Sequence, residues 1–370
     1  MEKRILITAT DLMTVQFLLP HIRRLAARGF AVELACSPVG GRLEEIRTAL
    51  AGTVRAIYPL RLKRSPFSPV NLMGLGQLKN LIAPGKYHII WTNEPVMGAM
   101  TRLAARSARK RGTKVVYMCH GFHFFRGANP GLWLFYPVES YLSRFTDVLV
   151  TVNREDEARA KTFHAGRVAY IRGIGMDPKH LQPQRTPDTV RQALGLRESD
   201  FLVLSVGELN KNKNHAVILR ALAMLNNPRI HYVICGTGAR RKPLEALAKK
   251  LGLGDRVHLP GYCPCIGDYL QVADLFAFPS RREGLGLAAL EAMHSGLALV
   301  ASDIRGVRDY GEEAGFLCRP DDAAGFARAI GELKDDPSLR RRFGGQNRET
   351  AKLYGPEQAS ADVLALFEGI

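Results

Sequence analysis

The sequence contains no run of eighteen or more apolar residues, so it offers no segment of the length that a membrane-spanning helix needs. It begins Met-Glu-Lys-Arg-Ile-Leu-Ile-Thr, which is typical of a first β-strand and not of a signal peptide. We therefore expect a cytoplasmic protein. The 370 residues, 46% of them hydrophobic, are enough to bury two cores, and the length favours two domains.

Recognisable metal ligands are also scarce. The six cysteines are scattered, and Cys263-Pro-Cys265 is too closely spaced for a zinc pair and has no second pair to complete it. We expect buried free thiols. The loops that follow the expected strands contain no Asp-X-Asp pair of the kind that binds Mg²⁺. The sequence thus predicts neither a metal site nor a cofactor.

Positive charge is abundant, with a net charge of +17, and it is unevenly distributed. Residues 1–178 carry 26 basic and 12 acidic residues, whereas the remainder carries 26 and 23. A basic half suggests an anionic membrane surface or nucleic acid. The basic residues of segment 61–64 precede Phe67, Leu72 and Met73, a mixture that suits a bilayer interface. A second basic cluster, residues 102–114, is equally well explained as a solvated surface.

Apolar strands alternate with helical segments in the first half, which predicts a parallel sheet covered by helices on both faces. The expected strands there are residues 4–8, 31–35, 54–58, 88–91, 114–119, 147–152 and 168–171. Residues 172–190 are rich in proline and glycine and predict a linker. A second alternation follows, with expected strands at 201–207, 232–235, 257–259, 275–278, 298–301 and 316–317. The fold class is therefore α/β, with two doubly wound domains.

Helical patterns separate these strands and close the chain. The expected helices include residues 17–28, 71–82, 96–111, 337–347 and 356–367.

One turn carries the clearest chemical signal. It follows the short strand 274–280 and consists of Glu283, Gly284, Leu285 and Gly286, with an apolar helix expected from Leu287. Glycines let a backbone approach a ligand closely, and the free amide groups of a helix N-terminus suit a diphosphate. Glu283 and Glu291 could accept hydrogen bonds from hydroxyls at the two ends of an extended ligand. An acidic first turn with one exposed glutamate explains the same residues without any ligand.

The spacing of Glu283 and Glu291, followed by Ala292-Met293 and residues 296–302, resembles the donor-site signature of glycosyltransferase family 4. Members of that family are retaining transferases with the GT-B fold. The resemblance covers the whole chain, and the sequence is similar to those family members that act as bacterial exopolysaccharide and capsule transferases. It implies an acceptor-binding Rossmann-like domain at 1–178, a nucleotide-sugar-binding one at 179–352, and a last helix, 353–370, that crosses back to the first. The two domains would face each other across a cleft.

In the family, the loop after the second domain's first strand carries an arginine and, five residues later, a lysine. Lys213 matches the lysine, and its charge could stabilise a departing diphosphate. Glu208, next to Gly207, stands where the family has arginine. The candidates for a replacement cation are Lys211, Arg281 and Arg282. Alternatively, the lysines are simply exposed in a polar turn.

The resemblance assigns catalytic roles to His120, Lys213 and Glu283, although a lone histidine is more often structural. It places Gly236 in a turn near the nucleotide and Tyr262 in the base-recognition loop. The family's glycines after the first strand are replaced here by Thr10 and Asp11, which could bind acceptor hydroxyls. The aromatic segment 122–125 could shape an acceptor pocket or belong to the core.

The resemblance implies metal-independent transfer of a hexose or N-acetylhexosamine from a UDP-sugar. The expected acceptor is a polyprenyl-diphosphate-linked glycan of a bacterial surface polysaccharide. The enzyme would bind peripherally to the inner face of the plasma membrane, where an anionic surface attracts its basic half. A UDP-sugar 2-epimerase of the same fold is the alternative. A nucleic-acid-binding protein ranks lower, because the sequence shows no aromatic-basic RNA motif and no DNA-reading helix.

Overall fold

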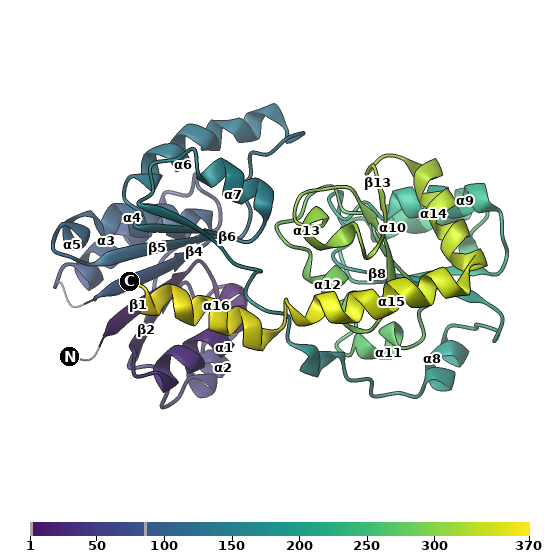
Figure 1. Ribbon diagram of the computed structural model, residues 1–370, viewed down its shortest axis with the longest axis horizontal. Helices are drawn as coiled ribbons and strands as arrows, with labels where there is room; N and C mark the ends of the chain where they lie inside the picture. Colours follow the sequence, from purple (N-terminus) through teal and green to yellow (C-terminus); the bar gives the residue numbers. More distant parts are fainter. Residues whose placement is uncertain (1–2, 85–86) are drawn as a thin grey trace. The chain divides into compact units, whose positions relative to one another are not determined.

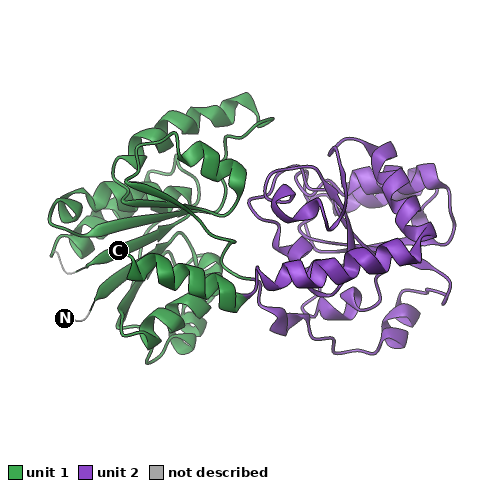
Figure 2. Cartoon of the chain, viewed as in Figure 1, with its two compact units in different colours: residues 1–175, 356–370 green, residues 176–355 purple. Residues whose placement is uncertain are grey.

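The computed structural model describes residues 3–84 and 87–370, and the chain divides into two compact units. Unit 1 consists of residues 1–175 and 356–370, and unit 2 consists of residues 176–355 (Figure 2). The expected domain boundaries at 178 and 352 lie within three residues of these limits.

Unit 1 is built on a seven-stranded parallel sheet with the order β3-β2-β1-β4-β5-β6-β7. The strands are β1 (Arg4–Ala9), β2 (Ala31–Cys36), β3 (Ala56–Pro59), β4 (Ile89–Asn93), β5 (Lys114–Cys119), β6 (Val148–Thr151) and β7 (Arg167–Tyr170). β2 and β4 are buried along their whole length, because helices cover both faces of the sheet (Figure 1). Each strand lies within two residues of its expected position.

The helical segments of unit 1 include the end of the chain. They are α1 (Leu12–Ala27), α2 (Leu43–Ala49), α3 (Val70–Ile82), α4 (Pro95–Ala104), α5 (Arg106–Lys110), η1 (Pro130–Leu134), α6 (Phe135–Ser143), α7 (Arg154–Ala160) and α16 (Pro356–Glu368). α16 packs on α1, and Phe367 contacts Trp91 of β4 with a ring separation of 5.3 Å. The C-terminal helix therefore completes the core of unit 1.

Two expected helices of unit 1 differ from the observed ones. The predicted start of α1 at residue 17 is wrong by five residues, because Asp11 accepts a hydrogen bond from the Thr14 amide and caps the helix. The expected helix 96–111 is two helices, α4 and α5, which meet at Ala105.

Unit 2 has a six-stranded parallel sheet with the order β10-β9-β8-β11-β12-β13. The strands are β8 (Phe201–Val206), β9 (Ile230–Cys235), β10 (Val257–Gly261), β11 (Leu275–Phe278), β12 (Ala298–Ser302) and β13 (Gly315–Cys318). The helices are η2 (Pro178–Leu181), α8 (Pro187–Ala193), α9 (Ala216–Leu225), α10 (Arg241–Lys250), η3 (Gly254–Arg256), α11 (Gly267–Leu270), α12 (Leu287–His294), α13 (Arg308–Gly311), α14 (Ala323–Asp335) and α15 (Pro337–Lys352). These strands, too, lie within two residues of the expected segments.

The expected linker at 172–190 is largely ordered structure. It contains η2 and the first turn of α8, which Asp177 and Thr186 cap. Asp268 accepts hydrogen bonds from the backbone amides of Gln184 and Arg185, at 2.6 and 2.9 Å, and fastens the segment to unit 2. Proline and glycine here mark helix starts and turns instead of a free connection.

The strand order reverses direction between β1 and β4 in unit 1 and between β8 and β11 in unit 2. Ligands of open α/β sheets bind outside the carboxyl ends of the strands at such switch points. The loops after these four strands are therefore the places to look for a site.

Candidate functional site

At the switch point of unit 2, the structure brings two predicted catalytic residues into contact. Lys213 lies in the loop after β8 and Glu283 in the loop after β11, and Lys213 Nζ is 2.7 Å from Glu283 Oε1. The side chains are 20% and 15% exposed. Lys213 Nζ also lies 5.1 Å from the centre of the Phe278 ring. A positive and a negative group thus stand side by side where a ligand of this sheet would bind.

The turn that carries Glu283 is held from several sides. Tyr310 donates a hydrogen bond to the carbonyl oxygen of Leu285 at 2.8 Å, and Asn212 donates to that of Arg282 at 2.9 Å. Gly286 has φ = 83°, and a Cβ there would lie 2.8 Å from the Tyr310 hydroxyl oxygen. Only glycine fits this conformation and this space.

Gly286 is also the N-cap of α12, which begins at Leu287 as expected. Because glycine has no side chain, the N-cap residue makes no side-chain hydrogen bond to the first amide groups of the helix. These amides and the helix dipole form a site that favours an anion. The turn therefore places a lysine, a carboxylate and a helix N-terminus around one edge of the sheet.

Glu291, on α12, has a partner that sequence reasoning missed. His180 Nε2 of η2 lies 3.0 Å from Glu291 Oε1, and this hydrogen bond raises the pKa of His180. Nothing in the local pattern around His180 signals this contact, since the two residues are 111 positions apart. A ligand hydroxyl that binds Glu291 has to compete with His180.

Two glycines allow the ends of β8 and β9 to approach each other. Gly236 has φ = 156°, and a Cβ there would lie 1.9 Å from the Gly207 carbonyl oxygen. Gly207 has φ = 149°, and its own Cβ would lie 3.0 Å from Lys213 Cε. Glycine at both positions lets Lys213 occupy the space at the strand ends.

Two further predicted residues of unit 2, Glu208 and Tyr262, are exposed. Glu208 is exposed and accepts a hydrogen bond from Asn210 at 2.9 Å. Tyr262 is exposed in the loop after β10. Of the three candidates for a second cation, Arg281 forms an ion pair with Asp321. Lys211 is exposed and Arg282 is half-buried, so both stay candidates.

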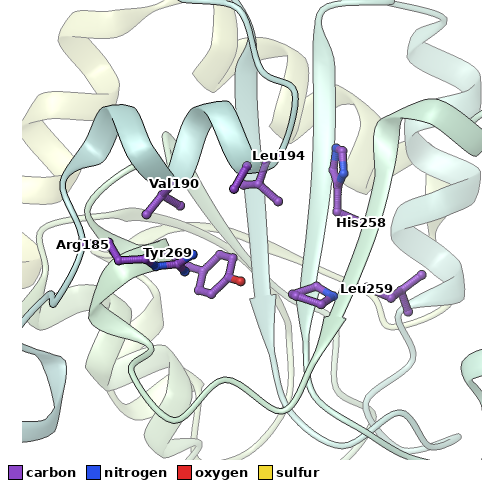
Figure 3. A pocket seen from close by; sticks show the side chains of 8 residues that line it. Arg185, Val190, Leu194, His258, Leu259 and Tyr269 are labelled. Atoms are coloured by element: carbon purple, nitrogen blue, oxygen red, sulfur yellow. The ribbon is translucent and has the colours of Figure 1, made fainter.

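A separate cavity of about 280 Å³ lies within unit 2 among α8, β10 and α11 (Figure 3). Arg185, His258 and Tyr269 are among its lining residues, and none of the predicted site residues is. The cavity is thus separate from the turn at Glu283.

In unit 1, His120 follows β5 and lies beside the end of β4. Its Nε2 atom is 3.2 Å from Asn93 Oδ1. Burial lowers the pKa of His120 to about 4, so the imidazole is neutral at pH 7. The neutral ring donates its one N–H, at Nε2, to Asn93 Oδ1 and keeps Nδ1 as an acceptor for a ligand.

Asp11 and Thr10, the residues expected to bind acceptor hydroxyls, are both buried. The Asp11 carboxylate caps α1 and forms an ion pair with Arg64. The Thr10 amide donates a hydrogen bond to Glu94 Oε2 at 2.7 Å. Asp11 is therefore occupied by protein partners, and Glu94 is the carboxylate that reaches the same strand end.

Glu94 was not anticipated, although the Glu-Pro pair directly after β4 is a signal that could have pointed to it. Its backbone has φ = 67° and ψ = 156°, a region that costs a non-glycine residue about 1–3 kcal/mol. Burial raises the pKa of its carboxyl group. Strain of this kind at a strand end is typical of residues placed for a ligand.

Glu94 and Thr10 line a second cavity of about 900 Å³ that lies entirely within unit 1. Phe122 and Phe124 form part of its wall, with ring centres 4.9 Å apart, and both are buried. These rings therefore belong to the core and also bound a cavity, and their role in binding an acceptor stays a prediction. His123 lines the same cavity.

Among residues 3–84 and 87–370, no group of three or more His, Cys, Asp or Glu side chains is arranged to hold a metal ion. All six cysteines are free, but the expectation that they are buried is wrong for Cys263 and Cys265, which are half-buried. None of the helices in this described part is long and apolar enough to cross a membrane.

Comparison with known proteins assigns the chain to a family. Residues 187–350 match the family "Glycosyl transferases group 1" and residues 16–173 match "Glycosyltransferase Family 4". The chain is 39% identical over 377 residues to the "Putative glycosyltransferase EpsD" of Bacillus subtilis, a match that covers 99% of this chain and 97% of that one.

A second relative is the Escherichia coli UDP-Gal:alpha-D-GlcNAc-diphosphoundecaprenol alpha-1,3-galactosyltransferase. It is 29% identical over 325 residues, which cover 84% of this chain and 81% of that one. The solved structure of Anabaena HepE in complex with UDP has a TM-score of 0.81 at 18% identity, with full coverage of both chains. That of WaaG, a lipopolysaccharide glycosyltransferase, has a TM-score of 0.71 at 18% identity, covering 96% and 98%. The protein is therefore a glycosyltransferase of family 4, with the two Rossmann-like units of the GT-B fold.

Proposed function

We propose that the protein transfers a hexose or N-acetylhexosamine from a UDP-sugar to a polyprenyl-diphosphate-linked glycan, with retention of the anomeric configuration. The observation that carries the proposal is the contact between Lys213 and Glu283 beside the N-terminus of α12. The name of the Escherichia coli relative supports both the donor and the acceptor, since it contains a UDP-sugar and a diphosphoundecaprenol. A Campylobacter jejuni relative, 31% identical over 46% of this chain, is also named for a diphospho-undecaprenol acceptor.

The site groups have distinct roles in this proposal. Lys213 and the first amides of α12 hold the diphosphate and stabilise the charge that grows on it as the anomeric C–O bond breaks. Glu283 accepts hydrogen bonds from the sugar, and Glu291 accepts them from the ribose once His180 releases it. The acceptor oxygen forms its bond on the same face of the sugar, and its proton passes to the leaving phosphate. Lys213 and the amides would do the work that a metal ion does elsewhere.

The basic surface of unit 1 supports a peripheral position at the inner membrane face. Unit 1 contains 26 Lys and Arg against 14 Asp and Glu, a net charge of +12. Arg61 and Lys63 are exposed, and so are the neighbouring Phe67, Leu72 and Met73. Flotation with anionic liposomes tests this part. We expect association in the wild type and its loss when Arg61, Lys63 and Arg64 are all replaced by Gln.

A screen of nucleotide sugars by thermal shift tests the donor site. A UDP-sugar should raise the melting temperature of the wild type, because a ligand that binds the folded state stabilises it. Glu291→Ala should abolish most of this shift. Glu332→Ala, at an exposed position on α14, is the matched control and should keep the shift.

The acceptor step needs a second measurement. Transfer of sugar to a synthetic prenyl-diphosphate glycan, unchanged by EDTA, would support the proposal. A free sugar released without acceptor would instead indicate an epimerase. The absence of any UDP-sugar shift, together with steeply salt-dependent binding to DNA, would contradict the proposed function altogether.

A further inference from the structure

The cavity of unit 1 is large and mainly apolar. Its volume of about 900 Å³ lies at the upper end of the range of roughly 300–1,000 Å³ that small-molecule sites occupy. Apolar lining residues come from α4, from the loop after β5 and from α6: Val96, Ala99, Met100, Phe122, Phe124, Phe135 and Val138. The polar lining residues include Thr10 and Glu94 at the strand ends and Glu139 of α6, which pairs with Arg102. A hydrocarbon fits these walls better than a sugar, which needs many polar partners.

One edge of the cavity is a loop that exposes an aromatic residue although its backbone is held in place. The Lys63 amide donates to Asn71 Oδ1 at 2.9 Å, and Asn71 Nδ2 donates to the Ser65 carbonyl oxygen at 2.8 Å. Phe67, in the same loop, lines the cavity and is 85% exposed. Phe67 is therefore exposed although hydrogen bonds hold the backbone of its loop in place.

α6 also lines the cavity, and apolar side chains are exposed along one of its faces. Leu134, the N-cap of α6, is followed by Val138 and Tyr141 at intervals of four and three residues, and its helical backbone places it on the same face. All three are exposed, Leu134 by 75%. Val138 also lines the cavity, so the exposed stripe continues into it.

The entrance carries positive charge. Arg64 lines the cavity, and its side chain is 62% exposed although it pairs with Asp11. Arg61 and Lys63 are exposed in the same loop. An amphiphile with an anionic headgroup and a hydrocarbon chain matches this combination of basic rim and apolar interior.

We infer that the cavity of unit 1 binds the isoprenoid chain of the acceptor lipid, which enters between Phe67 and Val138 while Arg64 contacts its diphosphate. The inference rests on the proposed function, because it takes a prenyl diphosphate as the acceptor's anchor. It assigns a specific part of that acceptor to residues outside the donor site. Acceptor affinity should therefore depend on the length of the chain.

Fluorescence of Trp133 provides a direct assay, since its ring lies 6.1 Å from that of Phe124 in the cavity wall. Farnesyl diphosphate should change the emission and bind roughly tenfold or more tightly than isopentenyl diphosphate, because the longer chain buries more apolar surface. Inorganic diphosphate probes the headgroup alone. Trp133→Phe should remove the signal and so identify its source.

Two variants test the location. Ala99→Phe fills the cavity from α4 and should erase the preference for the longer chain. Phe67→Ser alters an exposed side chain at the entrance, does not require the core to repack, and should weaken farnesyl diphosphate binding. Met224→Ser, at an exposed position of unit 2, is the matched control and should bind like the wild type.

Equal affinities for farnesyl and isopentenyl diphosphate would overturn the inference, and so would a chain-length preference that survives both variants. The latter result would show adsorption to other apolar surface. These failures differ from a failure of the proposed function. If only the cavity inference fails, a UDP-sugar still stabilises the wild type. If the proposed function fails, a UDP-sugar does not stabilise it.

Discussion

Replacing Lys213 with methionine keeps most of the side-chain length and removes the charge that faces Glu283. The two side chains are only 20% and 15% exposed, so solvent screens the pair incompletely, and leaving Glu283 without its partner should lower the stability of unit 2 by about 1–3 kcal/mol. For a unit of this size, each kcal/mol corresponds to a fall in melting temperature of roughly 2–4 °C. The protein should therefore remain folded at room temperature.

Donor binding should suffer as well. A hydrogen bond between a charged donor and a phosphate contributes about 1.5–3 kcal/mol. Loss of one such bond should weaken the affinity for UDP roughly 10- to 150-fold, as measured by calorimetry. If Lys213 also stabilises the departing diphosphate, kcat should fall by about 10²–10³, the range seen when a single stabilising donor is removed.

Lys242→Met is the control, because Lys242 is an exposed lysine on α10 and the change in charge is the same. It should leave UDP affinity and kcat unchanged. The reasoning is refuted if Lys213→Met binds UDP as tightly as the wild type. It is refuted as well if both variants lose the same affinity, since net charge and not contact would then be the cause.

Three further predictions concern pH, backbone and core. The bond to Glu291 raises the pKa of His180, so its contribution to stability is present below about pH 6.5 and is lost as the pH rises through the raised value. UDP affinity should increase over that same rise, and His180→Gln should flatten the profile. Gly236→Ala forces a Cβ to within 1.9 Å of a carbonyl oxygen at φ = 156°, so it should cost more than the roughly 1–3 kcal/mol of backbone strain alone and lower the melting temperature. Arg102→Met breaks a buried bidentate pair with Glu139, at 2.9 and 3.1 Å, and should cost about 3–5 kcal/mol in urea unfolding.

Each of these predictions has a contradicting result. A pH profile of UDP affinity that is the same in the wild type and in His180→Gln would exclude competition at Glu291. If Gly236→Ala melted at the wild-type temperature, the ends of β8 and β9 would be able to separate at little cost in stability. For the buried pair, Arg102→Met/Glu139→Leu should recover part of the lost stability, and no recovery would point to lost packing and not to an unpaired charge.

The strands were predictable because their signal is local. Residues 114–119 and 275–278 are short apolar runs bounded by turns, and β5 and β11 occupy the same limits. A strand of a parallel sheet is covered by helices on both faces, so nearly all of its residues are apolar. The apolar run alone therefore identifies the strand. The start of α1 was missed for the opposite reason. Asp11 is the kind of polar residue expected in a ligand-binding loop. Only the structure shows that its carboxylate caps a helix.

The sequence by itself identified the candidate donor site, because Gly286, Glu283 and Glu291 belong to one short motif at a strand end. Tertiary structure alone decided what these groups contact. The sheet order places β8 beside β11, and this brings Lys213 to Glu283 across 70 residues of chain. The same holds for His180 on Glu291 and for the cavity between Phe67 and Val138. Contacts between distant segments depend on how strands and helices pack, and no local pattern encodes that packing.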